Sequence, residues 1–247
     1  MTASVVVDAV SKRFKMTSQR TIKQVAVDAV RRRSTSYSFT ALDGVSFTLE
    51  QGESIGLMGL NGSGKSTLLK LISGVMAPDE GQVWTRGRIA GLIEVGAGLH
   101  PDLSGRENIY LNGAILGMSE VEIDSKFDSI LDFSEMEKFL DSEVRHYSSG
   151  QFMRLAFAVA VHTDCDIFLI DEVLAVGDQP FRKKCMKRIL ELKDEGRTMI
   201  FVSHNPKQVL RVCQRGLVLE GGKVVFEGSA ADAVKRINYD VNDEDED

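Results

Sequence analysis

The stretch ESIGLMGLNGSGKST, residues 53–67, is the clearest indication of the fold of this chain. Its first part, residues 53–58, is mostly apolar and predicts a buried strand, and residues 66–72 predict an apolar helix. The turn between them, residues 59–66, matches the pattern G-x-x-x-x-G-K-[ST] at every fixed position. A chance glycine turn before a helix is the alternative, but a strand before and a helix after are the context that a phosphate-binding loop requires. The stretch therefore predicts an α/β fold with such a loop (the P-loop).

Backbone N–H groups of the P-loop are expected to face phosphate oxygens, because glycines let the chain wrap tightly around an anion. The following helix adds the positive end of its dipole. Lys65 is expected to reach the β- and γ-phosphates of a nucleotide, and the Ser66 hydroxyl is expected to bind Mg²⁺. The residues assigned to the nucleotide are Gly59, Leu60, Asn61, Gly62, Ser63, Gly64, Lys65, Ser66 and Thr67.

A second apolar run ends in two acids. Residues 167–170 are Ile-Phe-Leu-Ile, and Asp171 and Glu172 follow them. Ligands bind at the carboxyl ends of buried parallel strands, so Asp171 is expected to hold Mg²⁺ through its water shell. Glu172 is placed to accept a proton from an attacking water. Alone, this pattern fits an ordinary strand end with solvated acids equally well, and the preceding P-loop favours the catalytic interpretation.

Two shorter motifs carry less information by themselves. The sequence Tyr-Ser-Ser-Gly-Gln, residues 147–151, precedes an apolar helix that contains Arg154. A hydroxyl and free N–H groups at a helix start suit a phosphate, which makes Ser149, Gly150 and Gln151 candidates, although most such sequences are only helix caps.

His204 follows the apolar run 198–202, which predicts another buried strand. From that position its side chain could contact a γ-phosphate and stabilise the charge that develops there. A lone histidine after a strand is a loop residue in most proteins. The other histidines, His100, His146 and His162, are assigned no functional role.

An insertion of about residues 16–38 separates two expected strands, residues 4–7 and 45–49. Its apolar residues recur at helical spacing before three arginines, which predicts an amphipathic helix with a basic C-terminal end. These residues are Ile22, Val25, Ala26, Ala29, Val30, Arg31, Arg32 and Arg33. The basic helix, residues 19–33, either lies near a membrane, where it meets anionic lipid or a pyrophosphate-linked substrate, or is a solvated surface helix.

The rest of the pattern alternates strands and helices. A strand or hairpin is expected at residues 83–93, and a helical insert at about residues 101–150. Three Ser-x-x-Glu sequences in the insert predict capping boxes: Ser104/Glu107, Ser119/Glu122 and Ser134/Glu137. Residues 217–219 and 224–226 flank Gly221-Gly222 and predict a hairpin, and a helix is expected after Ser229. Residues 240–247 form an acidic tail that we expect to be disordered.

Composition excludes several classes of protein. The net charge is −6, and six acids lie in residues 240–247, so a basic nucleic-acid-binding face is not expected. The three cysteines have no metal-ligand spacing, and an odd number argues against a disulfide framework. The longest apolar run, residues 155–161, is far shorter than the about 20 residues that span a bilayer. The expected membrane association is therefore peripheral.

In this order the motifs resemble the nucleotide-binding domain of ABC transporters over residues 1–239. The resemblance implies an α/β, RecA-like P-loop NTPase with a helical subdomain and an antiparallel β-subdomain, and an ATPase that uses ATP and Mg²⁺. Residues 147–151 would be the family's signature segment, and Asp178 would end the D-loop and contact nucleotide. The resemblance also implies a head-to-tail homodimer in which Ser149, Gly150 and Gln151 of one copy cover the ATP of the other.

Departures from the common family pattern indicate a particular subfamily. The signature segment is Tyr-Ser-Ser-Gly-Gln where Leu-Ser-Gly-Gly-Gln is usual, and Glu94 stands at the nucleotide-contacting position where a glutamine is usual. Together with residues 105–109 and the insertion, these features resemble ATPase subunits that export lipid-linked polysaccharides such as O-antigen, teichoic acid or galactan. That resemblance implies a lipid-linked glycan as transported substrate, two copies of an integral membrane permease as partners, and a peripheral place on the cytoplasmic face of the inner membrane. Tyr37 and Phe39 are both candidates to stack on adenine.

Other functions remain as alternatives. An ABC transporter for another substrate would share all of the ATPase motifs. Non-transport ABC ATPases of translation or DNA repair usually hold two ATPase units or a long coiled coil, and neither pattern is present in this sequence. A P-loop kinase would not account for the signature segment or for His204.

Overall fold

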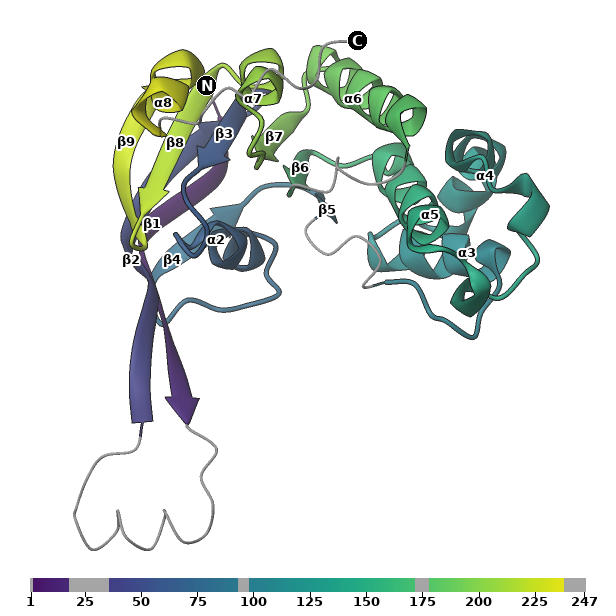
Figure 1. Ribbon diagram of the computed structural model, residues 1–247, viewed down its shortest axis with the longest axis horizontal. Coiled ribbons are helices and arrows are strands. Elements are labelled where there is room, and N and C mark those ends of the chain that lie inside the picture. Colours follow the sequence, from purple (N-terminus) through teal and green to yellow (C-terminus); the bar gives the residue numbers. More distant parts are fainter. Residues whose placement is uncertain (1, 18–35, 93–97, 172–177, 238–247) are drawn as a thin grey trace, which may run out of the picture.

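The computed structural model describes residues 2–17, 36–92, 98–171 and 178–237, which form two sheets and a group of helices (Figure 1). The strands are β1 (Ala3–Thr17), β2 (Ser36–Glu50), β3 (Ser54–Met58), β4 (Glu80–Thr85), β5 (Ile89–Leu92), β6 (Ile167–Ile170), β7 (Thr198–Phe201), β8 (Arg215–Glu220) and β9 (Lys223–Ser229). The helices are α2 (Lys65–Ile72), α3 (Gly105–Ile115), α4 (Glu120–Ser134), α5 (Ser149–His162), α6 (Gln179–Asp194), α7 (Pro206–Val212) and α8 (Ala230–Ile237), with short 3₁₀ turns η1 (Glu137–Phe139) and η2 (Val144–His146).

The larger sheet has the strand order β5-β6-β7-β3-β8-β9. Its first five strands are parallel, and β9 pairs with β8 in the antiparallel direction. Every residue of β3, β6 and β7 is buried, which confirms the expectation from their continuous apolar sequences. The predicted α/β class is therefore confirmed.

Alternate residues of these strands enter two different cores. Phe168 of β6 packs with residues of α5, α6, α7 and α8 on one face of the sheet. Leu169 packs on the other face, with α2 and with the apolar residues of β1 and β2. Because side chains along a strand alternate between faces, each buried strand fills both cores.

The smaller sheet has the order β2-β1-β4, with β1 antiparallel to both neighbours. The β1–β2 pairing continues past Phe14 and Phe39 to Thr17 and Ser36, as a twisted ribbon that projects from the body (Figure 1). The ends of the expected insertion, residues 16–17 and 36–38, are therefore strand. The predicted helix at residues 19–33 lies outside the described residues.

The expectation of one strand or a hairpin at residues 83–93 is corrected by the structure. Two strands lie there, but β4 pairs with β1 in the smaller sheet and β5 pairs with β6 in the larger one. The sequence shows two extended segments but not their partners, because β partners are set by tertiary contacts. The hairpin of β8 and β9 around Gly221-Gly222 and the helix after Ser229 are confirmed, while the acidic tail lies outside the described residues.

The helical insert is present as α3, α4, η1 and η2, followed by α5. It has its own core, which includes Ile109 of α3, Ile123 of α4 and Leu155 of α5. The opposite side of α5, with Phe157 and Val161, belongs to the core of the larger sheet. Helix α5 is thus shared between the helical subdomain and the sheet.

One of the three expected capping boxes is complete. Ser104 Oγ accepts from Glu107 N, and Glu107 Oε2 accepts from Ser104 N, at the start of α3. Ser119 caps α4, but the carboxylate of its partner Glu122 binds Arg88 instead. The third was wrong: Ser134 is the last residue of α4, where its hydroxyl donates to Leu131 O.

All three cysteines are buried, and none of them is in a disulfide. Burial raises the pKa of Cys165, Cys185 and Cys213 to about 12 in each case. Among the described residues, no helix is both long enough and apolar enough to cross a bilayer.

We predict that Ser104→Ala destabilises the protein by about 1 kcal/mol, because it leaves an N–H group of α3 without its cap. Chemical denaturation measures the change. Ser125→Ala, at an exposed position inside α4, is the matched control and should leave stability nearly unchanged. Equal effects of the two substitutions would contradict the role of the cap.

We also predict that the three thiols of the folded protein resist alkylation at pH 8. A thiolate is the reactive form, and a pKa of about 12 leaves almost none of it. Mass spectrometry after iodoacetamide treatment should show adducts only once denaturant is added. An adduct on the native protein would show that one of these sites opens to solvent.

Candidate functional site

The P-loop connects the carboxyl end of β3 to the start of α2, as the sequence predicts. Gly64 is the residue before α2 and has φ 108°, a conformation that side chains rarely adopt. A Cβ atom at Gly64 would lie 2.6 Å from Ala41 O and 2.7 Å from Leu42 Cδ2. The loop is therefore packed directly against β2, and this close approach requires a glycine.

Polar groups of the loop converge on the space that a phosphate would occupy. Lys65 is buried, and its Nζ donates to Gly59 O at 2.7 Å and to Leu60 O at 3.1 Å. The Ser63 hydroxyl is also buried, and among the described residues it has no hydrogen-bond partner. A buried hydroxyl without a partner is costly, and a phosphate oxygen would satisfy it. These residues fit a nucleoside phosphate.

Ser66 and Asp171 meet beside this loop, although 105 positions separate them in sequence. Ser66 Oγ donates to Asp171 Oδ2 at 3.4 Å. Asp171 directly follows β6, and the loop follows β3; in the sheet only β7 lies between these strands. A hydroxyl and a carboxylate are the oxygen ligands that Mg²⁺ accepts. These two residues fit a Mg²⁺ ion that takes its other ligands from phosphate and water. Among the described residues there is no cluster of three or more His, Cys, Asp or Glu side chains that could hold a metal.

His204 lies between these groups along the sheet edge. It follows β7, the strand between β6 and β3, and its side chain is exposed. The loop around it is held by its neighbours: Ser203 Oγ donates to Gln208 Oε1 and accepts from Asn205 N. Asn205 in turn caps α7. Two other predicted site residues, Glu172 and Glu94, lie outside the described residues.

The signature segment starts α5, and Ser148 is its N-cap. Ser148 Oγ accepts from Gln151 N, while Ser148 N donates to Gln151 Oε1. Ser149 and Gly150 are the first two residues of the helix. The sequence Ser148-x-x-Gln151 is itself a capping-box pattern and could have identified Ser148.

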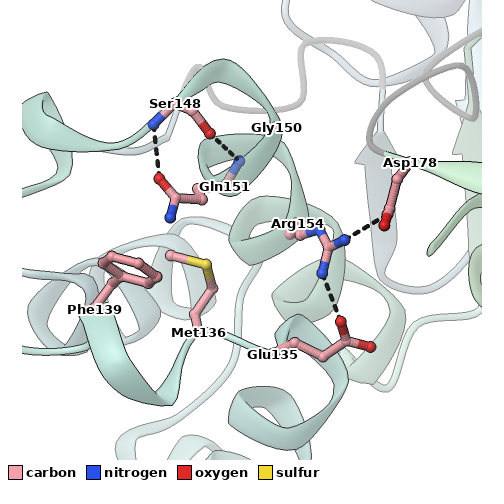
Figure 2. Close-up of a pocket in the computed structure, with 8 residues that line it drawn as sticks. All are labelled: Glu135, Met136, Phe139, Ser148, Gly150, Gln151, Arg154 and Asp178. Carbon is pink, nitrogen blue, oxygen red and sulfur yellow. Dashed lines mark hydrogen bonds and ion pairs between the residues drawn. The ribbon is translucent and has the colours of Figure 1, made fainter. Parts of the chain in front are cut away.

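A cavity of about 660 Å³ opens beside the signature segment. Figure 2 shows its lining, which combines apolar side chains of the α4–η1 region with polar groups of α5. The lining residues are Glu135, Met136, Phe139, Ser148, Gly150, Gln151, Arg154 and Asp178. Asp178, predicted to contact nucleotide, is engaged within its own chain by Arg154 at 2.5 Å.

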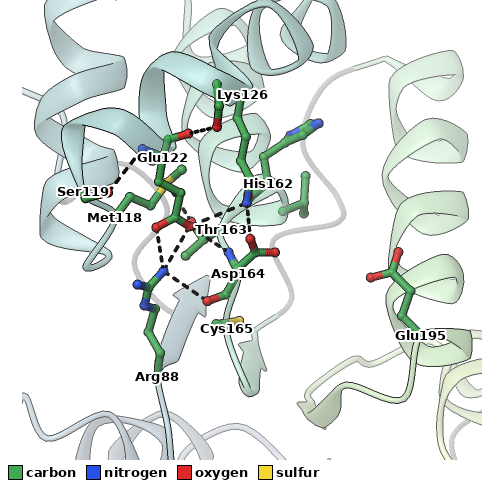
Figure 3. Close-up of polar contacts among 12 residues, drawn as sticks. Arg88, Met118, Ser119, Glu122, Lys126, His162, Thr163, Asp164, Cys165 and Glu195 are labelled. Atoms are coloured by element: carbon green, nitrogen blue, oxygen red, sulfur yellow. Dashed lines mark hydrogen bonds and ion pairs between the residues drawn. The ribbon is translucent and has the colours of Figure 1, made fainter.

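Charged contacts hold the helical subdomain, and with it the signature segment, to the sheet (Figure 3). Glu122 of α4 binds Arg88, which directly precedes β5, at 3.1 Å. Lys126 of α4 binds Asp164, between α5 and β6, at 2.6 Å. Hydrogen bonding to Arg88 and to Asp164 N outweighs desolvation and lowers the pKa of Glu122, so the network is charged at neutral pH. His162 is half-buried beside it; burial lowers its pKa, which supports a structural role.

The P-loop and the signature segment belong to different parts of one chain. Helix α2 packs against β1, β2 and the larger sheet, whereas α5 lies with α3 and α4 in the helical subdomain (Figure 1). Both helix starts present N–H groups suited to phosphate. This separation is the geometry expected if the two ends act on different nucleotides.

Comparison with known proteins gives the family of this chain. A family model described as ABC transporter matches residues 42–175. The chain is 46% identical over 192 residues to an O-antigen export system ATP-binding protein RfbB of Klebsiella pneumoniae, covering 78% of each protein. It is 48% identical to the ABC transporter protein AbcA of Aeromonas salmonicida over 77% of this chain and 62% of AbcA. It is 42% identical to the teichoic acids export ATP-binding protein TagH of Enterococcus faecalis over 81% of this chain and 46% of TagH.

A solved structure shares the fold. The dimeric, post-hydrolysis form of the ATP-binding cassette MJ0796, bound to ADP and Pi, superposes with a TM-score of 0.73 at 25% sequence identity, over 92% of this chain and 98% of that one. The fold, the order of the motifs and the family match lead to one conclusion: this chain belongs to the ABC transporter family.

Proposed function

We propose that this chain is the ATP-hydrolysing subunit of a system that exports a lipid-linked polysaccharide through a separate membrane subunit. The observation that carries the ATPase assignment is the meeting of Ser66 and Asp171 beside the P-loop at 3.4 Å. The export assignment is supported by the relatives, which are ATP-binding proteins of O-antigen and teichoic acid export systems. The chain spans only 62% and 42% of the first two relatives' lengths.

The proposal assigns a separate role on ATP to the P-loop, to Ser66 with Asp171, to Glu172 and to His204. P-loop amides, Lys65 and the Ser63 hydroxyl bind the phosphates and hold the γ-phosphate in one orientation. Ser66 and Asp171 hold Mg²⁺, which when bound neutralises charge on the β- and γ-phosphates. Glu172 takes the proton of the attacking water. His204, at the same sheet edge, donates to the γ-phosphate as negative charge develops on it.

A head-to-tail homodimer completes the site. The signature segment of one chain, with Ser148, Ser149, Gly150 and Gln151, covers the nucleotide on the P-loop of a second copy. The separation of α2 and α5 within one chain supports this arrangement, and MJ0796 is itself dimeric. ATP then joins the two copies, and hydrolysis releases them.

Three further assignments concern the adenine base, the metal-bound water and the membrane. Phe39 or Tyr37 stacks on adenine; Phe39 is exposed, and Ala41, two residues further along β2, lies beside Gly64. Glu94 fills the place of the usual glutamine near the metal-bound water. Two permease copies bind the dimer at the cytoplasmic face of the inner membrane, where residues 19–33 meet lipid or stay solvated.

We predict that Glu172→Gln keeps ATP affinity but loses most of the turnover, because binding groups survive while the proton acceptor is lost. A lost general base typically lowers the rate about 10²- to 10⁴-fold. The variant should form a dimer with MgATP in analytical ultracentrifugation and a monomer with ADP. Wild-type turnover in this variant would exclude Glu172 as the base.

We predict that depletion of this subunit causes a lipid-linked glycan to accumulate on the cytoplasmic side of the membrane, because synthesis continues while transport stops. Lipid extraction and glycan analysis measure the accumulation, and complementation with Lys65→Ala is the inactive control. Unchanged glycan with a defect in another transported compound would favour an ABC transporter of different substrate. No transport defect at all would favour a non-transport ATPase.

A further inference from the structure

A second cavity, of about 420 Å³, opens at the amino ends of β6 and β7, at the edge of the larger sheet opposite to the nucleotide site. Its lining comes from the start of β1, the turn after β2, the link from β4 to β5, the residue before β6 and the loop from α6 to β7. Small-molecule sites usually have volumes of about 300–1,000 Å³. The size of the cavity therefore suits a small ligand.

Hydrogen bonds between these segments hold the cavity in its shape. Ser4 and Thr198 are its buried lining residues, with 5% and 1% of their surface exposed, and Thr198 Oγ1 donates to Ser4 Oγ at 3.3 Å. Thr198 Oγ1 also accepts from Gly52 N, in the turn after β2, at 3.0 Å. Arg86 N, after β4, donates to Ser4 O at 2.9 Å. Asp166 N and Oδ2 bind the link from β4 to β5. The cavity is thus preformed.

Four lining groups have hydrogen-bonding capacity that no described residue uses. Neither the Arg86 guanidinium nor the Gln51 amide has a partner in the described part of the chain. The Ser4 hydroxyl accepts from Thr198, but its own hydrogen has no described acceptor. Asp166 accepts a backbone N–H at Oδ2, while its Oδ1 has no partner among the same residues. We call these the open groups: the Arg86 guanidinium, the Gln51 amide, the Ser4 hydroxyl and Asp166 Oδ1.

The other charged side chains of the lining are neutralised within the chain. Arg197 Nη2 lies 3.5 Å from Asp164 Oδ1, and Arg197 Nη1 donates to a backbone carbonyl at 2.8 Å. Glu195 Oε1 lies 3.0 Å from Arg188 Nη1. The charges left for a ligand are therefore those of the open groups, one positive and one negative.

The open groups fit a hydroxylated molecule that carries an oxyanion. A guanidinium binds phosphate or carboxylate through its fork of N–H donors. Asp166 Oδ1 can accept from a ligand hydroxyl, and Ser4 and Gln51 can form further hydrogen bonds. A bare anion would leave most of these groups unused and would face the carboxylate of Asp166. An apolar molecule would bury them without partners, and none of the described residues that line the cavity is aliphatic or aromatic.

We propose that this cavity binds a sugar that carries an oxyanion, either a sugar phosphate or a sugar acid. The oxyanion lies on Arg86, and the ring hydroxyls lie on Asp166, Ser4 and Gln51. The site is separate from the nucleotide site, because the P-loop and Asp171 lie at the carboxyl ends of the strands. The proposal requires neither ATP hydrolysis nor a dimer, so it stands or falls independently of the proposed function.

The test titrates glucose 1-phosphate and glucuronate into the full chain by isothermal titration calorimetry, with glucose and inorganic phosphate as comparison probes. Saturating MgADP is present throughout, so that the P-loop is occupied and does not take up the phosphate probes. One of the two sugar oxyanions should bind about tenfold or more tightly than glucose and than inorganic phosphate, because it uses charged and neutral groups together. The tighter of the two distinguishes a sugar phosphate from a sugar acid.

Arg86→Gln should weaken that binding by about 10- to 100-fold, because it removes the charged hydrogen bonds. The Arg86 side chain has no described partner, so the variant should fold and keep the basal ATPase rate. Arg236→Gln, at an exposed position of α8 outside the cavity, is the matched control and should bind like the wild type.

Three results would overturn the site: no binding of either sugar oxyanion to the wild type, unchanged binding in Arg86→Gln, or equal loss of binding in Arg236→Gln. Glucose or inorganic phosphate that binds as tightly as both sugar oxyanions would overturn the class of ligand.

Discussion

The parallel pairing of β6, β7 and β3 is the constraint on which the nucleotide site depends. Backbone hydrogen bonds set Ile170 opposite Phe201, and Phe201 opposite Gly56, so the three strands end at one edge of the sheet. Whatever follows each strand is then brought together there. Asp171, His204 and the P-loop share a site for this reason, although their sequence positions are far apart.

A parallel arrangement of this kind requires both faces of the sheet to be covered. Helices α5 to α8 cover one face, and α2 with the smaller sheet covers the other. The P-loop depends on that second layer as well, because Gly64 packs against Ala41 and Leu42 of β2. Leu42 thus belongs to the core and also packs against the phosphate-binding loop.

Helix α5 packs against both the larger sheet and the helical subdomain. Its side chains fill the core of the helical subdomain and the core of the sheet at once, and its N-terminal turn presents the signature segment. Arg154 of this helix binds Asp178 at the start of α6, and Lys126 of α4 donates to His162 O at the end of the helix and binds Asp164 just beyond it. The position of the signature segment therefore depends on the packing of both cores.

Sequence patterns alone predict the P-loop, the buried strands with their terminal acid, the helical insert and the C-terminal hairpin, because each of these is a local pattern of apolar residues, glycines and helix caps. Predictions from local patterns were wrong where contacts with residues distant in sequence set the secondary structure. Residues 83–93 became two strands of different sheets, the ends of the insertion became a ribbon, and Ser134 closed a helix where a new cap was expected. Only the tertiary structure brought Ser66 to Asp171 and Arg154 to Asp178. These pairs depend on strand order and on the docking of α5 against α6, which are decided by the packing of surfaces that no short stretch of sequence contains.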